Sequence, residues 1–157
     1  MSDLSDALSR LESILARSSA AIVPVLHPGL DESEVAHLLG GVGLRPTAEV
    51  VAWFGWHDGA GAQGMPNNMI EVVPGGEFYG LAYLCGEYLT TRKVASQLGA
   101  MPDSPFDAKQ RWPTHWFPLL RLFGKGFVVV DLAWGDGSRS PVHVGWHDGD
   151  PEERARV

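Results

Sequence analysis

The sequence contains a single cysteine, Cys85, among its 157 residues. One thiol cannot close a disulfide within the chain and cannot by itself build a cysteine-based zinc site. The composition therefore excludes a disulfide scaffold and favours a reducing, cytoplasmic compartment. Cys85 also lies in an apolar helical segment, where a thiol is expected to be an inert part of the core.

Positive charge is scarce. Lysine and arginine total 12 against 19 for aspartate and glutamate, which gives a formal charge of −7. This balance opposes direct binding to nucleic-acid phosphates and favours basic partners. Long hydrophobic runs are missing too, and the acidic start at residues 1–6 has no basic or apolar signal region. We therefore expect neither a membrane span nor a signal peptide.

The sequence also lacks the common catalytic and cofactor motifs. No serine lies in a Gly-x-Ser-x-Gly elbow, so a hydrolase triad has no anchor. The glycine cluster at residues 40–43 follows a predicted helix and lacks the Lys-Ser/Thr ending of a phosphate loop. We therefore expect no bound cofactor and no enzymatic activity.

A hydrophobic content of 45% is enough for one globular domain. Apolar spacing predicts helices near residues 4–15, 31–41, 46–56 and 78–98, with Pro46 at the start of the third. Strands are predicted at 70–73, 127–130 and 142–147. The strand at 127–130 is expected to be covered on both faces, because its apolar run is continuous. This order predicts a single α+β domain with helices packed on a mostly antiparallel sheet.

The pentapeptide Gly-Trp-His-Asp-Gly occurs twice, at residues 55–59 and 145–149. In the first copy the third helix would deliver an aromatic, titratable turn at the rim of the fold. If the two turns are neighbours, they form a shared contact region; otherwise they are two solvated turns of a common type. The predicted partner-binding residues are Trp56, His57, Asp58, Trp146, His147 and Asp148.

Metal binding is the main enzymatic alternative. His143 and His147 are too far apart to share an ion, because four residues of strand span about 13 Å. A metal-dependent hydrolase would have to combine His57 and Asp58 with His147 and Asp148 across the fold. Polar turn residues are usually only solvated, so we expect no metal.

Six tryptophans lie mostly near the predicted ends of elements. Tryptophan near turns on an acidic surface suits a protein-binding patch, because it offers a large apolar area with one polar atom. Interaction with another protein therefore fits these residues better than catalysis.

An ordered series of segments resembles the SUKH superfamily, which includes the fungal cell-wall assembly regulator and is abundant in bacteria. The matching segments are residues 28–35, 43–46, 56–59, 116–119 and 129–132. The resemblance covers most of the chain and implies an α+β fold without catalytic machinery. It places the family's helix-to-turn signature on Pro46 and residues 57–59, and its sheet signature on Trp116, Pro118 and Asp131.

Many bacterial members of that family are immunity proteins that neutralise a cognate polymorphic toxin, often a nuclease. The resemblance therefore implies a cytoplasmic immunity protein that binds a basic toxin domain. This chain differs from the family pattern at Arg45, where leucine is usual, and it ends without the common closing helix after the last strand. A regulatory scaffold with a housekeeping partner is a second non-enzymatic alternative.

Overall fold

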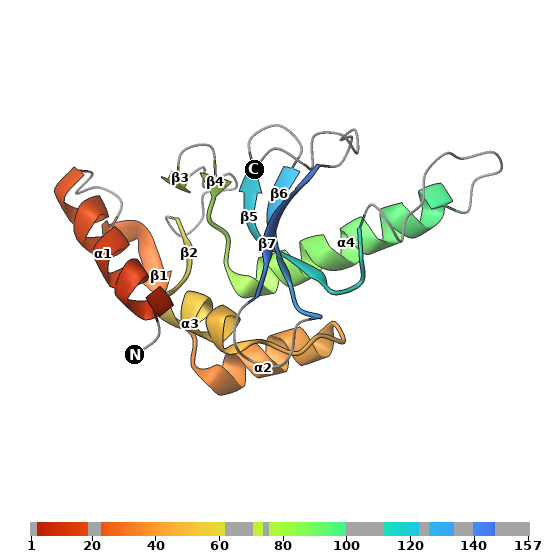
Figure 1. Ribbon diagram of the computed structural model, residues 1–157, viewed down its shortest axis with the longest axis horizontal. Coiled ribbons are helices and arrows are strands. Elements are labelled where there is room, and N and C mark those ends of the chain that lie inside the picture. Colours follow the sequence, from red (N-terminus) through yellow and green to blue (C-terminus); the bar gives the residue numbers. More distant parts are fainter. Residues whose placement is uncertain are drawn as a thin grey trace.

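The computed structural model describes residues 3–18, 23–61, 71–73, 76–99, 112–122, 126–133 and 140–146. These residues form an α+β fold in which α-helices accompany two antiparallel sheets, as predicted (Figure 1). In chain order the elements are α1 (Asp3–Ser18), the 3-10 turn η1 (Val23–Val25), β1 (Leu26–Pro28), α2 (Glu32–Gly41), α3 (Ala48–Trp56), β2 (His57–Ala60), β3 (Glu71–Val73), β4 (Gly76–Glu77), α4 (Leu81–Gly99), β5 (Trp116–Leu122), β6 (Gly126–Asp131) and β7 (Val142–Trp146).

The larger sheet has the strand order β3-β4-β5-β6-β7, and each neighbouring pair is antiparallel. In β5 and β6, Phe117 lies opposite Val130, and a bulge follows between Pro118 and Leu120. Strand β7 then pairs with β6, with Val142 opposite Val130. The predicted closing hairpin is therefore confirmed.

A second, two-stranded sheet joins β1 to β2 and is absent from the sequence prediction. The expectation of a polar turn at His57 and Asp58 is wrong, because both residues lie in β2. Strand β1 ends at Pro28, which is tolerated there because this strand pairs on one side only among the described strands.

Gly59 has φ +82°, and a Cβ on it would lie 2.4 Å from the Gly80 nitrogen. The strand therefore approaches the start of α4 through a position that only glycine accommodates.

Side chains at the helix starts explain where α2 and α3 begin. The capping box predicted for α2 is confirmed, since Asp31 Oδ1 accepts from the Glu34 nitrogen and Glu34 Oε2 accepts from the Asp31 nitrogen, each at 2.8 Å. Helix α3 starts later than predicted. Thr47 is its N-cap, with Oγ1 accepting from Val50, so Pro46 precedes the helix.

The hydrophobic core joins the helices to the larger sheet. Phe54 of α3, Phe78 after β4 and Phe117 of β5 are fully buried in one cluster. A smaller cluster on the other face of β6 contains Phe127 and Val129, together with Ala95 and Trp112. Because successive strand residues point to opposite faces, β6 is covered on both sides, as its apolar run predicts.

Figure 1 shows α2 and α3 together below the larger sheet, and α1 packs against α3. None of the helices in the described part of the chain has the length and apolar character needed to cross a membrane. Residues 147–157, where the absence of a closing helix is expected, lie outside the described residues.

Candidate functional site

Trp56, the last residue of α3, is half-buried and already has a polar partner. Its indole Nε1 donates to Glu12 Oε2 of α1 at 3.1 Å. Its ring stacks on Phe78, with 6.0 Å between the centroids and 24° between the planes. The side chain therefore ties α1 to the core, and only its remaining surface is available to a partner.

His57 and His27 hold the two strands of the small sheet together. His57 Nδ1 lies 2.8 Å from the His27 carbonyl oxygen, which places the proton on Nδ1. Its Nε2 is buried without a hydrogen-bond partner. The His27 ring in turn faces two carbonyl oxygens, that of Asp58 at 3.2 Å from Nδ1 and that of Gly61 at 3.0 Å from Nε2. A neutral His27 ring donates to one of these oxygens, and the imidazolium donates to both.

Asp58 caps the longest helix. Its Oδ1 accepts from the backbone nitrogen of Leu81, the first residue of α4, at 2.6 Å. A carboxylate at a helix N-terminus satisfies an otherwise unpaired N–H and interacts favourably with the helix dipole. Partner contact through Trp56, His57 and Asp58 stays a prediction. Polar atoms of all three already join elements of the fold, because Trp56 links α3 to α1, and His57 and Asp58 link β2 to β1 and to α4.

The second copy of the pentapeptide lies elsewhere. Its Gly145 and Trp146 belong to β7, and the Trp146 backbone lies opposite Gly126. Strand β7 is three strands from β4, whereas β2 bonds to the residue that follows β4. Three strand spacings amount to roughly 14 Å, so the described parts of the two copies are not neighbours. His147 and Asp148 lie outside the described residues.

Metal ligands do not gather in the described part of the chain, and its cysteine is buried. No group of three or more histidine, cysteine or acidic side chains there could hold a metal ion. Cys85 is 7% exposed, and burial raises its pKa to about 11. It is a neutral thiol inside the core at physiological pH, as expected for a structural cysteine.

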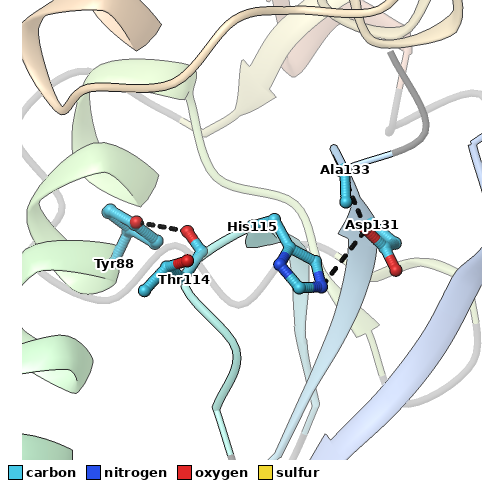
Figure 2. Close-up of polar contacts among 5 residues, drawn as sticks. All are labelled: Tyr88, Thr114, His115, Asp131 and Ala133. Carbon is cyan, nitrogen blue, oxygen red and sulfur yellow. Dashed lines mark hydrogen bonds and ion pairs between the residues drawn. The ribbon is translucent and has the colours of Figure 1, made fainter. Parts of the chain in front are cut away.

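A histidine–aspartate pair that the sequence analysis did not single out lies at the end of β6. His115 Nε2 is 3.5 Å from Asp131 Oδ1, which also accepts from the Ala133 nitrogen at 2.9 Å (Figure 2). The Tyr88 hydroxyl donates to the Thr114 carbonyl at 2.6 Å, so the segment before β5 is anchored to α4. These contacts close a turn and fasten a connector, and no hydroxyl or thiol of the described residues bonds to His115.

The positions of the family-like sheet signature are mainly structural. Pro118 is fully buried, and Asp131 is 8% exposed with its carboxylate occupied by the contacts described above. Trp116 is half-buried and stacks on the exposed His143, with 5.0 Å between centroids and 14° between planes. Of this signature, Trp116 with its neighbour His143 is the part that reaches the surface.

A second surface cluster, which we term the tyrosine–arginine patch, consists of Tyr79, Tyr83, Arg121 and Glu77. The two tyrosine rings stack with 4.4 Å between their centroids and 23° between their planes. Arg121 Nη1 lies 3.5 Å from the Tyr83 hydroxyl, and its Nε lies 3.8 Å from Glu77 Oε2. Tyr83 is 43% exposed and the Arg121 side chain 47%, so the cluster faces solvent while its members hold one another in place.

Glu77 is the buried support of this patch. It is 8% exposed, lies opposite Arg121 in the β4–β5 register, and accepts from the Tyr79 hydroxyl at 3.1 Å. Burial, and then the Glu77 charge, raise the pKa of Tyr79; burial, and then Glu87, raise that of Tyr83. Both phenols are therefore neutral at physiological pH, and the patch presents aromatic faces with acidic neighbours.

The sequence offered little signal for this patch. Tyr79 and Tyr83 fall inside the segment predicted as a buried helix, and Arg121 lies about 40 positions further on. Spacing four apart places two side chains together only if both are helical, yet Tyr79 precedes α4. The cluster depends on the pairing of β4 with β5, which no local pattern reveals.

Comparison with known proteins adds no assignment. No protein family model matches the chain, and no curated protein matches it in sequence.

Proposed function

We propose that this chain is a non-enzymatic, cytoplasmic protein-binding domain, an immunity protein that neutralises a basic toxin domain by direct contact. The observation that carries the proposal is the tyrosine–arginine patch. Tyrosine and arginine are among the residues enriched at the energetic centres of protein interfaces. Here the stacked rings and the Arg121 contacts fix the rotamers before binding, which lowers the entropy lost on association.

Charge supports a basic partner. The chain carries a formal charge of −7, and Glu77 and Glu87 act on the two phenols of the patch. A lysine or arginine of the partner would be attracted by these carboxylates and by the faces of the stacked tyrosines. Long-range attraction would speed the encounter, and buried aromatic contacts would slow release. The order of segments that resembles the SUKH superfamily points to a toxin as that partner.

The test is co-expression with the product of the adjacent gene, followed by co-purification and by a growth assay of cells producing the toxin domain. We expect a stable complex and protection of growth. In Tyr83→Ala, binding should weaken by about tenfold or more, because truncation of a central aromatic residue typically costs over 1 kcal/mol. The matched control is Val94→Ala, an exposed residue of the same helix outside the patch.

Two results would contradict the proposal. Failure of the adjacent product to bind, together with neighbours that encode metabolic enzymes, would favour the regulatory scaffold instead. A complex that tolerates both Tyr83→Ala and Arg121→Ala would place the contact surface elsewhere, and the predicted residues Trp56 and Asp58 would be the next to substitute.

A further inference from the structure

A pocket of about 320 Å³ lies between the helices and the larger sheet. The helix side is formed by α3, through residues such as Val50 and Trp53, and by the first turn of α1. The sheet side comes from β5, β6 and β7, including Val128 and Val142. The space is separate from the tyrosine–arginine patch, none of whose residues lines it.

The pocket has a buried floor and an open mouth. Val50 and Val130 in its lining are each 2% exposed, whereas Val142 is 59% exposed. The lining is almost entirely apolar, so water inside it would find few partners. Walls of this kind favour a hydrocarbon group over water, because burial of apolar surface is favourable.

Glu49 is the charged residue of the lining. Its Oε2 accepts from the Ser140 nitrogen, and the Ser140 hydroxyl donates to Thr47 Oγ1 at 2.7 Å. This carboxylate disfavours an anion in the pocket.

We propose that the pocket is a binding site for an uncharged small molecule with a hydrocarbon body and one hydroxyl group. Its volume is about twice that of a 150 Å³ apolar cavity that admits benzene in another protein. An uncharged hydroxyl can donate to the Glu49 carboxylate, which lines the pocket. A charged head group would lose hydration against walls that cannot replace it. This site is independent of toxin binding.

The test uses the whole chain and three probes of equal length: 1-octanol, octanoate and octane-1-sulfonate. Titration calorimetry and thermal unfolding should show that 1-octanol binds and raises Tm as its concentration increases, because it binds the folded state alone. Neither anion should do so at the same concentration. Absence of any effect of 1-octanol up to its solubility limit, or an equal effect of octanoate, would overturn the proposal.

Substitutions at the mouth locate the site. In Val142→Phe a ring occupies the entrance at an exposed strand position where phenylalanine is well tolerated, and 1-octanol binding should weaken by about tenfold or more. Val94→Phe, at an exposed position of α4 that does not line the pocket, should leave binding unchanged. Unaltered affinity in Val142→Phe would refute the assigned location.

Discussion

Asp58 Oδ1 lies 2.6 Å from the backbone nitrogen of Leu81, so a residue of β2 fixes the start of α4. The carboxylate accepts from a first-turn N–H of the helix. This role usually belongs to the N-cap residue, which directly precedes the helix in sequence. Here the cap comes from 23 residues upstream, and it couples the small sheet to the longest helix. The Asp58 carboxylate, which the sequence predicts to contact a partner, is thus already engaged within the fold.

Removal of this cap should destabilise the protein. We expect Asp58→Ala to lower the free energy of unfolding by about 1–2 kcal/mol, because a first-turn N–H loses its partner and the helix dipole loses a favourable charge. Urea unfolding followed by circular dichroism measures the change. Asp58→Asn is the matched control, since its amide oxygen can still accept, and it should retain most of the stability. A wild-type value for Asp58→Ala would show that water replaces the carboxylate without cost.

Two glycines should respond to alanine in opposite directions. A Cβ at Gly29 would lie 1.9 Å from the Gly55 carbonyl oxygen, which is backbone and cannot easily move. Gly29→Ala should therefore cost at least about 2 kcal/mol. At Gly86, within α4, a Cβ meets nothing within 4 Å, and Gly86→Ala should add about 0.5–1 kcal/mol because alanine favours the helix.

The two alanine variants are compared by chemical unfolding under one set of conditions. A tolerated Gly29→Ala would mean that the loop before α2 can move away from the end of α3. That result would also predict a weakened hydrogen bond from the Leu30 nitrogen to the Phe54 carbonyl, now 2.9 Å.

The buried thiol predicts a loss of stability at high pH. The pKa of Cys85 is about 11 in the fold and 9.0 for an ordinary thiol, so the unfolded chain loses its proton first as pH rises. The folded state is then disfavoured between about pH 9 and pH 11, and the contribution is fully present below pH 9. The stability of Cys85→Ala should fall less steeply than that of the wild type across this window. Parallel curves of stability against pH for the two proteins would contradict the effect assigned to the Cys85 thiol. Tyrosine and lysine ionisation affects both proteins alike, so the difference between the curves does not contain it.

Divalent metals should leave the melting temperature unchanged. Zinc, manganese and nickel stabilise a folded protein only if they bind it in preference to the unfolded chain, and the described residues hold no suitable group of ligands. A thermal-shift series at several metal concentrations measures this. An upward shift that disappears in His57→Ala would instead support the metal-dependent hydrolase alternative.

Local patterns predicted the α+β class and most elements. The capping box at Asp31 and Glu34 and the β-branched run of β6 carry their own signals, because a cap and a covered strand are defined by adjacent residues. The predicted start of α4, at residue 78, lies three residues before the observed start at Leu81. Phe78 shares the apolar character of the helix, but its carbonyl accepts from the Ala60 nitrogen instead of joining a helical turn.

The site was harder to predict than the fold for a physical reason. His57 and Asp58 look like a polar turn in isolation, since Asp-Gly is a frequent turn pair. Their pairing with residues 26–28 depends on contacts over about 30 positions, and so does the bond between His57 and the His27 carbonyl. The repeated pentapeptide is a poor guide for the same reason, because its Gly-Trp pair ends helix α3 in the first copy and lies in the outermost described strand of the larger sheet, β7, in the second.

The burial of Cys85 has a practical value for labelling experiments. Because the chain's one native sulfhydryl is enclosed and protonated under ordinary conditions, a cysteine engineered at Tyr83 or Val142 would be the dominant target for maleimide dyes. A fluorophore or spin label at Tyr83 would report on the tyrosine–arginine patch, and one at Val142 would report on the entrance to the pocket between the helices and the larger sheet.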